Sequence, residues 1–282
     1  MIYIGLAGWG DHESLYKNGV APKNKLREYA GHFPIVEVDA SFYAIQPEKN
    51  AMKWVEDTTS TFQFIVKAYQ GMTGHERGSI PYQTKEEMFQ AFIQSLIPYQ
   101  KSKKLAMVLF QFPPWFECTK ANVNYLRYCK QLMGEIPLAL EFRHQSWFTP
   151  QYKDGTLHFM KEEGWIHSIC DEPQAGNGSI PTILTASQPD KTLVRFHGRN
   201  VYGWKRPKQG DWREVRYLYR YNQEELMDWK EKVLVLTEQS KDVYIIFNNN
   251  SGGDAADNAK QFMELLGVEY EGLLAPRQLD LF

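Results

Sequence analysis

Eight short segments rich in β-branched and aromatic residues recur along the chain, and helical periodicity fills most of the gaps between them. Strands that alternate with helices pair in parallel, because each helix returns the chain to the same edge of the sheet. In 282 residues, this alternation favours an α/β fold of the TIM-type (β/α)8 barrel class over an open doubly wound sheet. The predicted strands are 2–8, 35–41, 62–68, 105–112, 137–143, 165–171, 192–198 and 242–248.

Helix signals frame most of these strands. Thr84 with Glu87 and Asn222 with Glu225 have capping-box spacing, and apolar residues then recur three or four positions apart. The exception is 172–191, which is rich in Pro, Gly and Ser and carries no convincing helix pattern. We therefore expect an irregular barrel without a full helix between strands six and seven.

No linker divides the chain, so we expect one barrel domain over 1–274 and an extended tail over 275–282. The turn after the first strand, Gly8-Trp9-Gly10-Asp11, lacks the GxGxxG spacing of dinucleotide-binding folds.

The composition of the chain excludes several classes of protein. With 43% hydrophobic residues the chain is not intrinsically disordered, and a net charge of -2 gives no overall attraction to nucleic acid or membrane. The 3 cysteines lack CxxC spacing, which predicts reduced thiols rather than a disulfide framework. No apolar run is long enough to cross a bilayer. We expect a cytoplasmic protein with no membrane partner.

Nearly every predicted strand ends in a polar or charged residue. TIM-barrel active sites lie at these carboxyl ends, so the side chains should converge on one cavity. The strand-end residues are Trp9, Glu37, Asp39, Lys67, Gln111, Glu141, Arg143, Asp171, Arg195, His197 and Asn248. Strand alternation places on shared faces Glu37 with Asp39 and Ser41, Glu141 with Arg143, and Arg195 with His197 and Arg199.

Two interpretations of these residues stay open. The opposite charges nearly balance, so they can form a structural layer of salt bridges or meet solvent at the strand ends. Their number and common position favour a functional site.

Several sequence blocks carry these strand ends: 36–43 (VEVDASFY), 64–68 (FIVKA), 110–114 (FQFPP), 141–148 (EFRHQSWF), 194–199 (VRFHGR) and 247–249 (FNN). In this order they resemble the YecE-like family, also called domain of unknown function 72. The resemblance implies a TIM-barrel-like fold and no particular reaction. Two features depart from the family pattern: Asp39 stands where Asn is usual, and the usual Thr-His pair reads Thr73-Gly74-His75.

A metal-free mechanism would use Lys67 as a base or Schiff-base nucleophile, with Glu37 or Glu141 as its acid or base partner. Lys67 could equally be no more than the ion-pair partner of Glu37. We predict catalytic roles for Glu37, Asp39, Lys67, Glu141 and His197. We predict substrate or phosphate binding by Trp9, Gln111, Arg143, Asp171, Arg195, Arg199 and Asn248, since guanidinium groups bind phosphate bidentately.

No cofactor is predicted, and a single divalent metal ion is the alternative. Imidazole and carboxylate ligands suit such an ion, whereas the neighbouring cations of Lys67, Arg143 and Arg195 repel it. The candidate ligands are His144, His197, Glu141, Asp39 and Asp171.

The segment 199–221 interleaves cations with aromatic residues, as nucleic-acid-binding grooves do. The alternative is that its rings pack the loop onto the barrel. The candidate nucleic-acid-binding residues are Tyr202, Trp204, Lys205, Arg206 and Lys208.

The final residues, Gln278-Leu279-Asp280-Leu281-Phe282, resemble the pentapeptide with which bacterial replication and repair proteins bind the sliding clamp. In such a peptide Gln278 would occupy a polar pocket, with Leu279 beside it, and Leu281 and Phe282 would fill an apolar cleft. The alternative is that the apolar tail packs under the barrel.

Together these features predict a hydrolase or lyase that acts on DNA or on a phosphorylated sugar or nucleotide. It would work in nucleic-acid metabolism or repair and be recruited by the sliding clamp. The alternatives are a non-catalytic DNA- or clamp-associated protein and a small-molecule sugar-phosphate isomerase, lyase or hydrolase.

Overall fold

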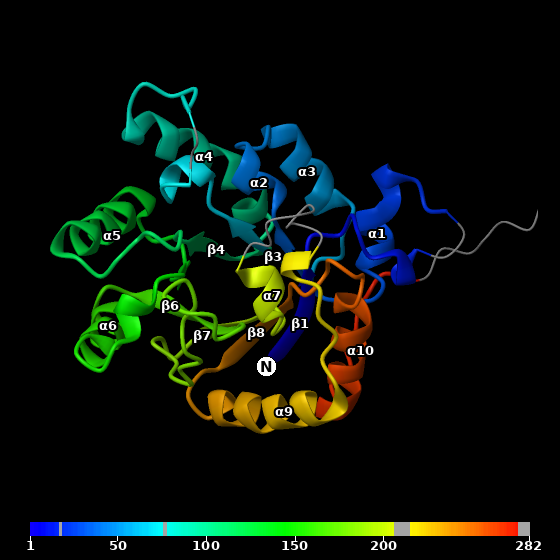
Figure 1. The fold of residues 1–282 in the computed structure, drawn as a ribbon. Coiled ribbons are helices and arrows are strands. Elements are labelled where there is room, and N and C mark those ends of the chain that lie inside the picture. The colour runs from blue at the N-terminus through cyan, green and yellow to red at the C-terminus, as the bar shows by residue number, and fades with distance from the viewer. Residues whose placement is uncertain (17–18, 76–77, 206–214, 276–282) are drawn as a thin grey trace, which may run out of the picture.

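The centre of the computed structural model is a closed barrel of eight parallel strands, in which each strand pairs with its neighbours in sequence order (Figure 1). The structure describes residues 1–16, 19–75, 78–205 and 215–275. The strands are β1 Ile2–Ala7, β2 Ile35–Val38, β3 Gln63–Lys67, β4 Leu105–Gln111, β5 Leu138–Glu141, β6 Trp165–Asp171, β7 Lys191–Phe196 and β8 Asp242–Phe247. The predicted TIM-type barrel is thus confirmed.

Helices surround the barrel, and the short helix α7 lies across the end that faces the viewer (Figure 1). The α-helices are α1 Lys25–Tyr29, α2 Ala40–Tyr43, α3 Glu48–Glu56, α4 Lys85–Lys101, α5 Lys120–Met133, α6 Lys153–Glu162, α7 Val201–Trp204, α9 Gln223–Thr237 and α10 Ala255–Leu266. Single 3-10 turns are η1 Glu13–Leu15, η2 Pro22–Asn24, η3 Gln70–Met72 and η4 Gln145–Phe148. Within the described ranges, no helix is long and apolar enough to span a bilayer.

The connection between β6 and β7 is described throughout, and none of its residues 172–190 is helical, as the sequence predicted. Polar contacts hold it instead: Ile180 N donates to Glu172 Oε1 at 2.6 Å, and Thr182 Oγ1 donates to Cys170 O at 2.9 Å. These contacts hold the crossover against the carboxyl end of β6 without a helix.

Side chains on the two faces of the strands form two separate apolar clusters. The larger one lies between the barrel and its helices, and the smaller one fills the barrel interior. Next to the interior cluster, Gly5 allows β1 to pass close to β2. A Cβ at this position would lie 2.1 Å from the carbonyl oxygen of Ile35. The interior cluster includes Ile35, Ile65, Met107, Leu109, Ala139, Ile166, Leu193, Tyr244 and Ile246.

Two expectations about shared strand faces are wrong. Strand β2 ends at Val38 and α2 begins at Ala40, so Asp39 and Ser41 do not continue the face of Glu37. After β7, Gly198 has a φ of 78°. This left-handed conformation turns the chain, so Arg199 leaves the face of Arg195 and His197.

Candidate active site at the carboxyl ends of the strands

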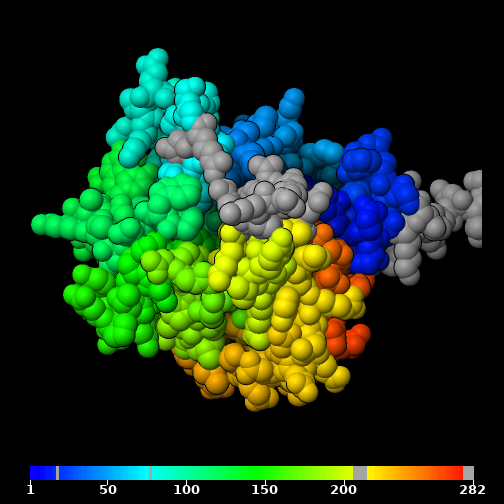
Figure 2. All heavy atoms as spheres, viewed as in Figure 1, coloured from blue at the N-terminus to red at the C-terminus, as the bar shows by residue number. Residues whose placement is uncertain are grey.

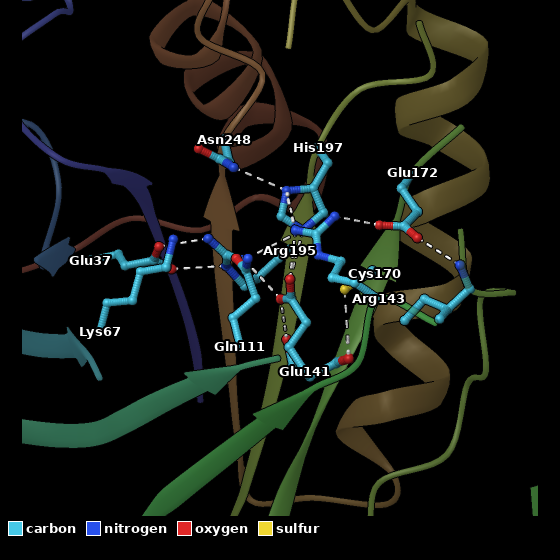
Figure 3. A network of polar contacts seen from close by, with 12 residues as sticks. Glu37, Lys67, Gln111, Glu141, Arg143, Cys170, Glu172, Arg195, His197 and Asn248 are labelled. Carbon is cyan, nitrogen blue, oxygen red and sulfur yellow. Dashed lines mark hydrogen bonds and ion pairs between the residues drawn. The ribbon is translucent and has the colours of Figure 1, made fainter. Parts of the chain in front are cut away.

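Arg195 of β7 lies at the centre of a buried group of charges in the barrel (Figure 3). Its Nε and Nη2 donate to the two carboxylate oxygens of Glu37, from β2, at 2.8 and 2.6 Å. Its Nη1 donates to Oε2 of Glu141, from β5, at 2.8 Å. This guanidinium therefore joins carboxylates that are far apart in sequence.

Arg143 extends the group toward the β6–β7 crossover. Its Nη2 lies 2.6 Å from Glu141 Oε1, and its Nη1 donates to Glu172 Oε2 at 2.6 Å. Glu37, Glu141, Arg143, Glu172 and Arg195 are here called the ionic cluster. Charges this deeply buried are tolerated because each has an opposite partner.

His197 lies against the ionic cluster and is itself fully buried. Its Nε2 accepts from Arg143 Nη2 at 2.9 Å, and its Nδ1 lies 3.0 Å from the amide nitrogen of Asn248 (Figure 3). Burial and the neighbouring charge of Arg143 lower the pKa of His197 well below its usual value. The imidazole is therefore neutral and offers a lone pair to Arg143.

The three carboxyl groups of the ionic cluster differ in acidity. Burial raises the pKa of Glu37 and of Glu172 to about 7, although Arg195 and Arg143 oppose this rise. Burial also acts to raise the pKa of Glu141, but Arg143 and Arg195 together hold it well below the usual value. Glu141 is thus the most acidic of the three carboxyl groups.

Lys67 and Asp39 lie closer to solvent, with 14% and 34% of their side chains exposed. Lys67 Nζ is 3.3 Å from Asp39 Oδ1, so its ion-pair partner is Asp39 rather than Glu37. Gln111 contacts the ionic cluster from the same side, since its Oε1 accepts from Arg195 Nη1 at 3.4 Å. The structure therefore brings a partly exposed ammonium group next to the ionic cluster.

Two side chains at this end of the barrel, Tyr217 and His75, lie near several cations. Burial acts to raise the pKa of Tyr217, yet Arg216, Arg143, Lys67 and Arg195 lower it overall. Burial lowers the pKa of His75 to about 3, and Lys67, Arg143 and Arg216 lower it further in the same direction. Cations gathered beside one site can attract an anionic ligand.

The segment after β7 covers part of the ionic cluster. Trp204 of α7 has Arg143 Cζ 5.2 Å from its ring centre, and its Nε1 donates to Gly178 O at 3.1 Å. In the space-filling view, the yellow-green atoms around α7 lie in front of the strands (Figure 2). Tyr202 and Lys205 are exposed. Trp204 therefore packs over the site rather than presenting a free face.

Some predicted site residues lie elsewhere. The ring of Trp9 packs edge-on against Trp54 of α3, at 5.1 Å between ring centres. Asp171 pairs with Arg199 at 3.0 Å, and Arg199 also reaches Glu225 of α9 at 3.0 Å. These three charges form a second ion-paired group, apart from the ionic cluster. Outside the described residues lie Arg206, Lys208, Gln278, Leu279, Leu281 and Phe282.

Potential metal ligands come close together at one place among the residues that the structure describes. Among them, Glu141, Cys170 and His197 bring ligand atoms within 4.8 Å of one another. Both oxygens of Glu141 already contact guanidinium nitrogens, at 2.6 and 2.8 Å. Burial also raises the pKa of Cys170 well above its usual value, which opposes a thiolate ligand. This donor set does not suit a cation.

Sequence reasoning missed Glu172 and Tyr217. Strand alternation through Ser168 and Cys170 carries on to Glu172, so the period of two could have found it. Ser168 Oγ donates to Glu141 Oε2 at 3.0 Å, which confirms that this face points to the ionic cluster. Tyr217 lies in the aromatic segment, but no local pattern indicates that its ring comes 6.0 Å from that of His197.

The fold and site together define a TIM-type barrel protein with a buried cluster of charges at the carboxyl ends of its strands. The sequence profile described as protein of unknown function DUF72 matches residues 3–280. The chain belongs to this family, as the sequence blocks predicted.

Two curated relatives share this assignment. The chain is 68% identical to UPF0759 protein YunF of Bacillus subtilis over 283 residues, which cover 100% of both chains. It is 25% identical to UPF0759 protein YecE of Escherichia coli K12 over 216 residues, covering 70% of this chain and 74% of that protein.

Solved structures of the same family have the same fold. A DUF72 family protein from Enterococcus faecalis V583 superposes with a TM-score of 0.92 at 40% identity, covering 99% of this chain and 100% of that one. A DUF72 family protein from Thermotoga maritima MSB8 gives a TM-score of 0.81 at 30% identity, covering 95% and 100%.

Proposed function

We propose that this barrel is an enzyme that binds a phosphate-bearing substrate, a phosphorylated sugar or a nucleotide unit, at the carboxyl ends of its strands. The observation that carries the proposal is geometric: Lys67, with 14% of its side chain exposed, lies at the carboxyl end of β3 beside the ionic cluster. A phosphate group has the complementary charge.

The roles of the residues follow from their exposure and partners. The guanidinium groups of Arg143 and Arg195 are engaged with carboxylates, so they support the site rather than clamp the ligand. Lys67 is a partly exposed cation beside the ionic cluster and would contact the phosphate. Lys67 paired with Asp39, and the phenol of Tyr217, can donate or accept protons beside that ligand. This set of groups supports a hydrolase or lyase.

A titration with inorganic phosphate and with ribose 5-phosphate tests the binding step. Lys67→Met should weaken binding of both by about tenfold, the effect of losing one charged hydrogen bond. Lys241→Met is the matched control, because this exposed lysine precedes β8 at the opposite end of the barrel. No binding to the wild type, or equal binding by the Lys67 variant, would reject the proposal.

A setting in nucleic-acid metabolism or repair, in the cytoplasm, is also part of the proposal. Its support is the tail Gln278–Phe282, which matches the clamp-binding pattern, and the basic aromatic segment with Tyr202 and Lys205. The free thiols of Cys118, Cys129 and Cys170 agree with a reducing compartment.

Deletion of residues 278–282 tests recruitment by the sliding clamp. Binding of the full chain to a purified bacterial clamp should be lost in the deletion variant, while the thermal midpoint of unfolding stays the same. If both forms bind equally, the tail has no such role. A clamp-binding chain without turnover of any phosphorylated substrate would favour the non-catalytic alternative.

A further inference from the structure

Four aromatic side chains form a continuous chain of ring contacts beside Lys67. Phe42 meets Tyr43 at 5.3 Å and His75 at 5.1 Å, and His75 meets Trp115 at 6.0 Å between ring centres. These four residues, Phe42, Tyr43, His75 and Trp115, are here called the aromatic rim. They follow β2, β3 and β4, so the carboxyl ends of three neighbouring strands place them together.

The aromatic rim presents ring surface to solvent. Tyr43 is 70% exposed and Trp115 is 58% exposed, which leaves large apolar faces unpacked. His75 is held in place by Thr73, whose Oγ1 lies 2.9 Å from His75 Nδ1. Large exposed aromatic groups beside a charged site are typical of ligand contacts rather than of core packing.

The aromatic rim also adjoins the cation assigned to phosphate binding. Lys67 Nζ lies 4.8 Å from the ring centre of Phe42, so the ammonium group and the first ring of the rim are in contact. A nucleotide carries its base and its phosphate on opposite sides of one sugar. A ligand with phosphate at Lys67 would therefore place its base over the neighbouring rings.

We propose that the aromatic rim is a stacking subsite for the nucleobase of a nucleotide, or of a single-stranded nucleic-acid end, whose phosphate is bound at Lys67. This inference rests on the proposed phosphate-binding function and deepens it, because it selects nucleotides over simple sugar phosphates. It also places base contacts on the β2–β4 side of the barrel, away from Tyr202 and Trp204 of α7.

The hydrogen-bonding groups near the aromatic rim favour a base over a sugar. Gln70 Nε2 is engaged with Tyr43 O at 3.3 Å, and Thr73 Oγ1 is engaged with His75. The Gln70 amide nitrogen and the Thr73 hydroxyl are thus less available to the hydroxyl groups of a sugar. A planar base needs only ring faces, and it stacks with little dependence on its identity.

Equilibrium titrations with three probes test the subsite: adenosine 5′-monophosphate, ribose 5-phosphate and inorganic phosphate. The wild type should bind the nucleotide about 5- to 150-fold more tightly than ribose 5-phosphate, the gain expected from stacking one base. Trp115→Ala and Tyr43→Ala should each remove most of this preference and leave the affinity for ribose 5-phosphate unchanged. Trp115→Phe should retain most of it. Tyr152→Ala, at an exposed tyrosine that precedes α6, is the control and should change nothing.

The outcomes separate this inference from the function on which it rests. If nucleotide and ribose 5-phosphate bind equally, or if the preference survives both alanine variants, the stacking subsite is rejected while phosphate binding at Lys67 stands. If none of the three probes binds the wild type, both proposals fail. Circular dichroism of each variant confirms that the fold is retained.

Discussion

The two halves of the barrel interior differ in chemistry although the same strands build both. Toward the amino ends of the strands the interior is apolar, and Ile35, Ala139 and Leu193 belong to one buried cluster there. Two residues further along the same strands stand Glu37, Glu141 and Arg195. One step of strand alternation thus separates a packed core from a buried ionic cluster. The comparison teaches that each strand supplies both the support and the site.

The two halves also differ in what they contribute to stability. The apolar half gains from removing hydrocarbon surface from water, at about 25 cal/mol per Å². The ionic cluster gains little overall, because desolvation of its charges offsets most of their attraction. We infer that the apolar half stabilises the barrel and the charged half is held in place by it. Four changes test this division.

Arg195→Met should have the largest effect. It leaves Glu37 and Glu141 buried without their shared partner, which should lower the free energy of unfolding by about 3 to 5 kcal/mol. Urea denaturation followed by circular dichroism measures this loss. Arg127→Met, which breaks the more exposed pair with Glu163, is the control and should cost at most about 1 kcal/mol. If both variants lose the same free energy of unfolding, the charges of the ionic cluster do not stabilise one another more than an exposed ion pair does.

Glu172→Gln should remove a pH dependence of stability. Burial raises the pKa of Glu172 to about 7 in the folded protein, against about 4.5 when unfolded. Between these values the folded state holds the extra proton, so its stability is greatest below pH 4.5 and falls as the pH rises through 7. From pH 5 to 8 the wild type should lose up to about 3 kcal/mol more than the variant. If denaturation shows that the wild type and the variant lose the same stability from pH 5 to pH 8, the raised pKa of Glu172 is contradicted.

Ile246→Val trims the apolar half by one methylene group. A fully buried isoleucine in a packed interior should lose about 1 kcal/mol of unfolding free energy. Affinity for inorganic phosphate should not change, because the substitution leaves the charges in place. A change in phosphate affinity with little loss of stability would mean that the two halves are not separable.

Asp39→Asn should have the smallest effect and the opposite direction. It removes the negative partner of Lys67 at a partly exposed position, so it should tighten phosphate binding by about threefold. Calorimetric titration with inorganic phosphate measures the change. Weaker binding would indicate that Asp39 positions Lys67 rather than competing with the ligand.

The sequence predicted the barrel because its strands are short, apolar and separated by helix signals, and it predicted the helix-free crossover because Pro, Gly and Ser dominate there. The predicted strand ends also included most of the ionic cluster, because the end of a strand can be recognised from the local sequence. Asp171 was predicted to bind substrate, but strand alternation after Cys170 turns its side chain away from the ionic cluster, where it meets Arg199.

The pairing of the charges could not be predicted. Arg195 bonds Glu37 across the barrel, which follows from strand order and barrel curvature rather than from any local pattern. That bidentate contact occupies both oxygens of Glu37, and so Lys67 pairs with Asp39. Trp9 stands at a strand end but packs against Trp54, because a glycine on each side lets the chain turn there.

Residues 172–190 limit how this barrel can be rebuilt by exchange of modules. In a regular barrel, a helix follows each strand and packs on the outside of the barrel. Here the main-chain amide of Ile180 holds Glu172, and Glu172 holds Arg143. A grafted helical crossover would remove the anchor of that guanidinium, so protein design on this scaffold should keep the native crossover and diversify the loops on the β2–β4 side.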